Sequence, residues 1–251
     1  MRCARCNTDL GHGALVCSQC GAVVGMSYGP AQPPEAFSAP RMSAAPFAAP
    51  GAGAIKPLTA RVASILGSPR QEWQVIAAEP TGVVDIYTRY VLPLALIGPL
   101  ALAIYQVAIG TPLPLVGVVK VALVAGIAAA LLTFAFALLQ VFVLAWAVNA
   151  FARKFQAVPD RLAALKVVAY SLTPVWLVGV LYLLPALAFL WVFAAIYAVF
   201  LAFVGLQVLM RCTPQQALGY TFATLGVAFA LWVATGALVT AIMGFGPVML
   251  E

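Results

Sequence analysis

Residues 167–210 read VVAYSLTPVWLVGVLYLLPALAFLWVFAAIYAVFLAFVGLQVLM, a run of 44 residues without Asp, Glu, Lys or Arg. As one α-helix this run would be about 66 Å long, at about 1.5 Å per residue, whereas the hydrocarbon core of a bilayer is about 30 Å thick. The run must therefore cross a membrane twice. Pro185, in the sequence YLLPAL, is the expected hairpin, because proline interrupts a helix.

The composition of the whole chain agrees with a membrane protein. Of its 251 residues, 64% are hydrophobic and 8% are charged, whereas a soluble domain is about 45–50% apolar and about 25% charged. Asp160 is the one acid between residues 86 and 250. So few charges cannot cover a soluble globule, and the predicted fold class is an all-α membrane protein.

The uncharged stretches on either side of this run predict a five-span helix bundle. The expected spans are residues 86–109, 115–149, 167–184, 186–210 and 217–244. Pro93 and Pro99 predict a kink in the first span, and the charged residues from 153 to 166 predict an exposed connector before the third. Four or six spans are the alternatives, since the hairpin at Pro185 has no polar turn.

The basic residues predict the orientation of the bundle. With the N-terminus in the cytoplasm and the C-terminus outside, 12 of the 13 Lys and Arg residues fall on the cytoplasmic side, as the positive-inside rule requires. Lys120 is the exception. It is either a functional charge inside the membrane or a side chain that reaches the outer headgroups, and the second interpretation is favoured because no acid on that side can pair with it.

Residues 1–21 contain two Cys-x-x-Cys motifs separated by ten residues. Their four cysteines are Cys3, Cys6, Cys17 and Cys20. Two such turns can place four thiolates around one ion, which is the donor set of a structural zinc site. Because a segment of this length cannot form an apolar core, it needs a bound metal or disulfides to fold. Disulfides require an oxidising compartment, and the predicted cytoplasmic placement therefore favours a zinc ribbon.

A linker and a short helix connect this ribbon to the bundle. Residues 22–67 are rich in Ala, Pro, Gly and Ser and predict a disordered linker. Ser68 is then an expected N-cap, with Pro69 at the first helical position. The helix that follows is amphipathic and should lie in the headgroup layer with Trp73 inward. The membrane domain accordingly covers residues 68–251.

A group of polar side chains is expected just inside the cytoplasmic face of the bundle. Its members are Asp85, Arg89, Tyr90, Tyr170, Ser171 and Thr173. Asp85 and Arg89 are four residues apart and can pair on one helix face. Pro174 cannot donate a backbone hydrogen bond to the carbonyl of Tyr170, so a nearby hydroxyl could satisfy it. The group is either a polar vestibule or a structural kink that fits the third span against its neighbours.

Four stretches of the membrane region carry a family pattern. They are Pro69 and Trp73 ahead of Glu79 with TRYVLPLALIGPL (88–100), AYSLTPVWLVGVLYLLP (169–185), IYAVFLAFVGLQVLM (196–210) and TPQQALGYT (213–221). On these residues the chain resembles the Yip family (Ypt-interacting proteins) over about residues 68–245. The resemblance implies a five-span fold and brings no catalytic residues. Its eukaryotic members are linked to Rab-type GTPases and vesicle traffic, whereas the ribbon and linker look like the bacterial branch, which implies a bacterial inner membrane.

Several classes of function are excluded or disfavoured. The one histidine, His12, lies in the ribbon, and HExxH, GxSxG and phosphate-loop motifs are absent, so the chain is not expected to be an enzyme. Basic residues that flank apolar runs do not indicate nucleic-acid binding. The favoured hypothesis is therefore a membrane scaffold or adaptor. Its expected partners are the lipid bilayer and a cytosolic protein bound through the ribbon, and it could also form a homo-oligomer. The alternative is an uncoupled transporter or channel for a lipid or small apolar molecule.

Overall fold

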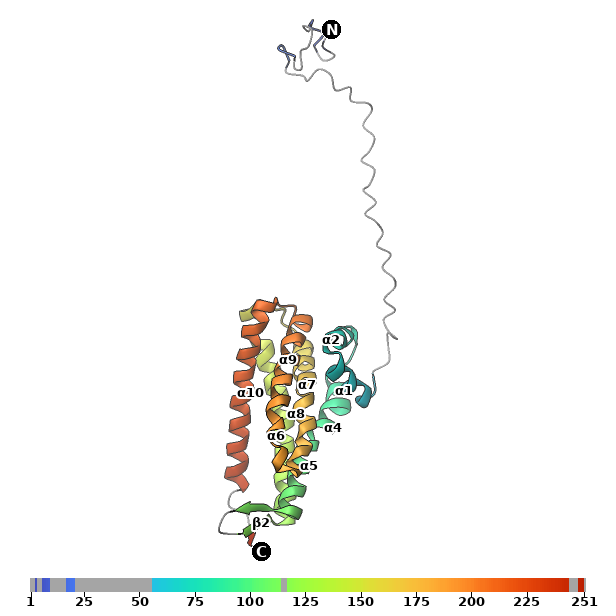
Figure 1. Ribbon diagram of the computed structural model, residues 1–251. Coiled ribbons are helices and arrows are strands. Elements are labelled where there is room, and N and C mark those ends of the chain that lie inside the picture. Colours follow the sequence, from blue (N-terminus) through green and yellow to red (C-terminus); the bar gives the residue numbers. More distant parts are fainter. Residues whose placement is uncertain are drawn as a thin grey trace. The chain divides into compact units, whose positions relative to one another are not determined.

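The computed structural model of the chain describes residues 3, 6–9, 17–20, 56–113, 117–243 and 248–250. The chain divides into two compact units, Met1–Ala49 and Pro50–Glu251. The second unit is a helical bundle with a small β-sheet (Figure 1). Most of the predicted linker, residues 22–55, lies outside the described part of the chain.

Five helices of the described chain are long and apolar enough to cross a membrane. They run Val83–Ile109, Leu123–Phe155, Arg161–Leu183, Leu190–Leu209 and Pro214–Ile242. The predicted all-α membrane class and the count of five are therefore confirmed. The second and third spans do not begin where the sequence predicted.

The first span is assembled from short pieces. They are α3 (Val83–Ile86), a π-helical turn (Tyr87–Val91), α4 (Leu92–Ala95), α5 (Ile97–Ile104) and a second π-helical turn (Tyr105–Ile109). In the first π-helical turn the N–H of Leu92 donates to the carbonyl of Tyr87, five residues back. Pro93 follows directly and has no N–H to continue the α-helical ladder. The span is thus interrupted at the predicted proline.

Two helices precede the first span, and the first of them corrects the predicted linker. Helix α1 (Leu58–Gly67) occupies residues that were assigned to the linker, and α2 (Pro69–Ala78) follows as expected. Pro57 is the N-cap of α1 and has an extended backbone conformation. The last ten linker residues place Leu58, Val62 and Ile65 on one face, a helical period that the overall Ala and Pro content had hidden. Trp73, which was expected to face inward from the headgroup layer, is fully buried within the protein.

A three-stranded antiparallel sheet corrects the predicted start of the second span. Strands β1 (Thr111–Leu113), β2 (Gly117–Val121) and β3 (Val248–Leu250) pair in the order β1-β2-β3. The span was expected to begin at residue 115, but α6 (Leu123–Phe151) begins at Leu123. Valines at 118, 119 and 121 favour a strand, and Gly117 has φ +94°, which is open to glycine. Lys120 therefore lies in β2, opposite Met249, and not inside a membrane helix.

The third span begins earlier than predicted. Helix α7 (Arg161–Ser171) starts at Arg161, because the Asp160 side chain caps it by accepting from the N–H groups of Leu162 and Ala163. Lys166 was placed in an exposed connector, but it lies on α7 with only 5% of its surface exposed. After α7 come α8 (Thr173–Val178) and a 3-10 turn (Gly179–Leu183).

The rest of the bundle follows the predicted order. Its elements are two 3-10 turns (Ala152–Phe155 and Pro185–Leu187), α9 (Leu190–Leu209) and α10 (Pro214–Met243). The break at Pro185 separates the third and fourth spans, as expected. Figure 1 places α1 and α2 at one end of the bundle and β2 at the other. Helices α6, α7, α9 and α10 pack around one core, and α2 packs against α9.

Candidate metal centre and charged pocket

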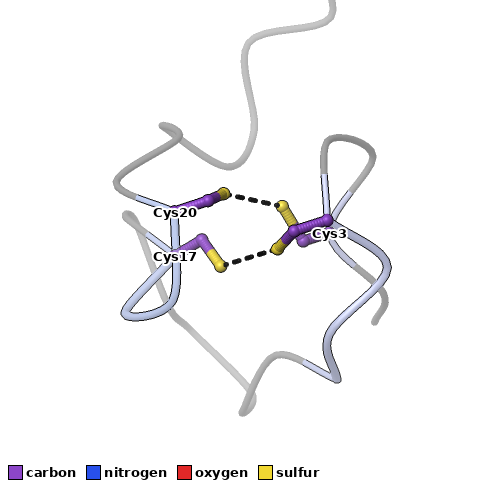
Figure 2. A group of neighbouring side chains, drawn as sticks. Cys3, Cys17 and Cys20 are labelled. Atoms are coloured by element: carbon purple, nitrogen blue, oxygen red, sulfur yellow. Dashed lines mark hydrogen bonds between the residues drawn. The ribbon is translucent and has the colours of Figure 1, made fainter.

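The four predicted metal ligands lie together in the first unit. The Sγ atoms of Cys3 and Cys20 are 3.7 Å apart, and those of Cys6 and Cys17 are 3.6 Å apart (Figure 2). All four sulfurs lie within 4.8 Å of one another. These distances exceed the S–S bond of a disulfide, which is about 2.05 Å. The cluster could therefore hold a metal ion.

The sulfur spacing fits a tetrahedral thiolate shell. Four sulfurs at about 2.3 Å from a central zinc would be about 3.8 Å apart, close to the two measured pairs. The turn after the first motif is tight, since Asn7 has φ +60° and its N–H donates to the carbonyl of Cys3. The Thr8 hydroxyl contacts the Cys6 Sγ at 3.3 Å. This side-chain hydrogen bond, followed by one from the Thr8 backbone, lowers the pKa of Cys6 to about 6 and favours the thiolate that binds metal.

A buried ion cluster joins α1 to α2 in the second unit. The Nη1 of Arg61 donates to Glu72 Oε1 at 2.5 Å, and Nη2 pairs with Glu79. Lys56 Nζ contacts the other oxygen of Glu72 at 2.6 Å. Arg61 is only 2% exposed, and its guanidinium lies 5.6 Å from the ring centre of Tyr170. Removing one partner would leave a buried charge unpaired, so this cluster fixes the two helices together.

Lys166 ties this cluster to the third span. Its Nζ donates to the backbone carbonyls of Ile76, at 3.0 Å, and Glu79, at 2.7 Å. Both carbonyls belong to the C-terminal end of α2, where helical carbonyls lack partners inside the helix. A cation on α7 therefore caps α2 and anchors it to the bundle.

The structure brings five of the six predicted vestibule residues together. Arg89 Nε and Asp85 Oδ1 lie 3.5 Å apart, which confirms the predicted i,i+4 pair. Thr173 Oγ1 lies 2.6 Å from the hydroxyl of Tyr90 and donates to the carbonyl of Tyr170 at 2.6 Å. This is the carbonyl that Pro174 leaves without a donor. Because Thr173 has one hydroxyl hydrogen and gives it to that carbonyl, Tyr90 must be the donor in the hydroxyl pair.

A pocket of about 340 Å³ opens beside these residues. Its polar lining consists of Lys56, Arg61, Thr81, Asp85, Arg89, Tyr90 and Tyr170. The rings of Tyr90 and Tyr170 meet edge to face, with centres 4.6 Å apart. Four of the six predicted residues thus line a pocket at the start of the first span, and Thr173 lies behind its tyrosine wall.

Ser171 faces a different cavity. This second cavity is about 620 Å³ and is lined mainly by apolar side chains of α6, α7, α8, α9 and α10. In the part of the chain that is described, the buried Ser171 Oγ and the Trp191 Nε1 have no hydrogen-bond partner, and both residues line this cavity. Adjacent residues on a helix point about 100° apart, so Tyr170 and Ser171 belong to separate spaces.

The sequence did not predict the buried charges of the ion cluster beside this pocket. Arg61, Glu72 and Lys166 are buried, whereas the sequence indicated only exposed or flanking charges. One signal was present: Glu72 and Glu79 are seven residues apart and share a helix face. Arg61 likewise shares the apolar face of α1 with Leu58 and Ile65. A charge on an apolar helix face needs a partner, and the two faces supply partners for each other.

Comparison with known proteins identifies the membrane region. The family model described as the Yip1 domain matches residues 63–235 of the chain. The match begins within α1 and ends within α10, so it includes the apolar cavity and all or part of every span. Of the charged pocket it includes Thr81, Asp85, Arg89, Tyr90 and Tyr170, whereas Lys56 and Arg61 precede it. No curated protein and no solved structure matched the chain.

Proposed function

The chain belongs to the Yip1 domain family, and on this premise we propose that it is a non-enzymatic membrane adaptor with a zinc-binding recognition module. Cys3, Cys6, Cys17 and Cys20 would hold one structural zinc. Four thiolates fill the tetrahedral shell of zinc and leave no open position for a substrate, which supports a structural role. The single observation that carries the proposal is this sulfur cluster in a compact unit separate from the membrane bundle.

The proposed setting is a bacterial inner membrane with the N-terminus in the cytoplasm and the C-terminus outside. The basic residues near Arg61, Arg153 and Arg211 support this orientation. Strand β3 supports the placing of the two ends of the membrane domain on opposite sides, because pairing with β2 holds residues 248–250 at the opposite end of the bundle from α1 and α2. The module would then meet cytosolic proteins, and reduced thiolates would persist there.

Crosslinking in native membranes tests the adaptor role. Cells would carry the full chain, a Cys17→Ser variant or a matched Cys212→Ser variant, and crosslinked partners would be compared by mass spectrometry. We expect the partners of the wild type to be lost with Cys17→Ser and kept with Cys212→Ser, because Cys212 lies between α9 and α10 and is not one of the four clustered cysteines. Identical partners in all three strains would contradict the proposal.

A second candidate function is the uncoupled passage of a lipid or small apolar molecule, and the apolar cavity favours it. The cavity lies among α6, α7, α8, α9 and α10, and Ser171 and Trp191 add two hydrogen-bonding groups that have no partner among the described residues to a mainly apolar lining. Purified protein in vesicles should then speed the transfer of a fluorescent short-chain lipid between leaflets. Ala195→Phe, which fills the cavity, should slow this transfer, and Val233→Phe on the exposed side of α10 should not. A rate equal to that of protein-free vesicles would exclude this function.

A further inference from the structure

The charged pocket at the start of the first span has an excess of cations. Lys56, Arg61 and Arg89 line it, against one acid, Asp85. Its volume of about 340 Å³ suits a small polar group, since ligand pockets in proteins begin at about 300 Å³. Behind the lining, Glu72 and Glu79 pair with Lys56 and Arg61, and Lys166 contacts the carbonyl of Glu79, so the whole cluster has four basic and three acidic residues. An anion would therefore balance its charge.

Thr81 provides an independent sign of a missing partner. Its side chain is 4% exposed and lines the pocket, and its Oγ1 has no hydrogen-bond partner among the described residues. Its backbone is well held, because the N–H of Thr81 donates to the carbonyl of Glu79 at 2.9 Å. Buried hydroxyls in proteins normally have a partner, so this one is placed to donate to a bound group.

The three cations differ in how firmly they are held. Arg61 is fixed at the bottom of the pocket by two glutamates. The side chains of Lys56 and Arg89 are 31% and 66% exposed, and Arg89 contacts Asp85 only at 3.5 Å. An exposed pair of this kind contributes little stability, so Arg89 can turn toward a ligand at small cost. Lys56 is held by Glu72 at 2.6 Å but keeps further N–H groups for a ligand. The pocket thus combines a rigid base with one paired and one movable N–H donor at its rim.

We propose that this pocket binds the phosphate group of a net-anionic ligand. Arg89 and Lys56 would donate N–H bonds to the phosphate oxygens, the Thr81 hydroxyl would donate a third bond, and Arg61 would supply positive potential from below. Val83 begins the first span two residues after Thr81, so the pocket lies at the depth of lipid headgroups. A lipid phosphate and a free phosphate share this chemistry. The site does not depend on the zinc module or on the adaptor role.

Native mass spectrometry of the purified full chain tests the proposal. The probes are dioctanoyl phosphatidylglycerol, dioctanoyl phosphatidylcholine and inorganic phosphate. We expect the anionic lipid or inorganic phosphate to bind the wild type, and Arg89→Gln and Thr81→Val each to weaken that binding about tenfold. Arg153→Gln, which removes an exposed cation away from the pocket, should bind like the wild type. Asp85→Asn should bind more tightly, because it removes the repelling acid.

The two sources of phosphate give different results. Binding of the lipid without competition from inorganic phosphate assigns the site to a headgroup, and binding of inorganic phosphate alone assigns it to a soluble anion. The melting temperatures of the unliganded variants should match that of the wild type, since Arg89 and Arg153 are exposed and the Thr81→Val and Asp85→Asn substitutions are isosteric. Binding of neither anion would overturn the proposal. So would binding to Arg89→Gln and Thr81→Val at the level of Arg153→Gln.

Discussion

At the scale of single residues, Thr173 repairs the backbone that Pro174 interrupts. Pro174 has no N–H for the carbonyl of Tyr170, and a bilayer offers no water to replace it. The Thr173 hydroxyl donates to this carbonyl and accepts from Tyr90, with both distances at 2.6 Å. One fully buried oxygen therefore satisfies the third span and ties it to the first.

Thr173→Val should destabilise the protein by about 1–3 kcal/mol, because the Tyr170 carbonyl and the Tyr90 hydroxyl would both lose their partner. Thr173→Ser keeps the hydroxyl and should behave like the wild type. Tyr90→Phe should destabilise the protein less than Thr173→Val, since it removes one hydrogen-bond donor and leaves the Tyr170 carbonyl paired with Thr173. Circular dichroism recorded during unfolding in detergent measures these differences in stability. Equal stability of the Val and Ser variants would refute this account.

The four clustered thiols should also behave as one unit. Purified full-length protein should contain one zinc per chain by elemental analysis, and a chelator should release it. Thiol titration should then show four groups that react only after chelation, because metal-bound thiolates are shielded. Cys212 is the built-in control: burial raises the pKa of its thiol, and its slow reaction should not depend on the chelator. Protein without metal, or with these four thiols oxidised in the cell, would contradict the zinc site.

At the scale of elements, α2 docks on the bundle through Trp73 and Gly205. Trp73 is fully buried against α9, and a Cβ added at Gly205 would lie 2.7 Å from its ring. The contact is possible only because α9 has no side chain at this position. Together with the caps from Lys166, it holds the α1–α2 pair on the third and fourth spans.

Gly205→Ala should therefore lower the free energy of unfolding by about 1–3 kcal/mol through overpacking, and it should loosen the contact between α2 and α9. Hydrogen exchange of residues 69–78 measures this loosening directly. Gly226→Ala is the matched control, because nothing lies within 4 Å of an added Cβ there and α-helices favour alanine over glycine. If both variants exchange at the wild-type rate, then Trp73 does not anchor α2.

Features that depend on one-dimensional patterns could be predicted from the sequence. Five spans followed from uncharged length, and the cysteine cluster followed from spacing alone. Helix α1 was missed because the ten helical residues were averaged into a long Pro-rich segment. Lys166 was misplaced because its burial depends on carbonyls of α2, 87 and 90 residues away in the chain. Burial of a charge is decided by tertiary partners, which hydropathy does not report.

At the scale of the whole molecule, the two ends of the bundle differ in kind. Helices α1 and α2 lie at one end, and strand β2 lies at the other (Figure 1). The first end carries the ion cluster, because Arg61 and Glu72 belong to α1 and α2, and the second carries the three-stranded sheet. Strand β3 pairs with β2, so the segment after the fifth span joins the loop between the first two spans. With an odd number of spans, the two ends of the membrane domain must lie on opposite sides of the bilayer.

Single-cysteine labelling in intact cells measures this topology. In a background without the native cysteines, Thr111→Cys and Val248→Cys should react with an impermeant thiol reagent from outside. Ser43→Cys and Gln156→Cys should react only after the membrane is opened. Labelling of Gln156→Cys but not of Thr111→Cys in intact cells would invert the proposed orientation.

The docking of α2 on later helices also imposes an order in time. The ribosome produces Trp73 and Glu79 long before Lys166 and Gly205, so the α1–α2 pair must wait at the membrane surface while some hundred residues are inserted. During that interval the indole and the α2 carbonyls face water or lipid headgroups. In a nascent chain arrested before α9, the side of the α1–α2 pair that contacts α9 would stay exposed. Cellular proteases could recognise this exposed surface and so distinguish an incomplete chain from a complete one.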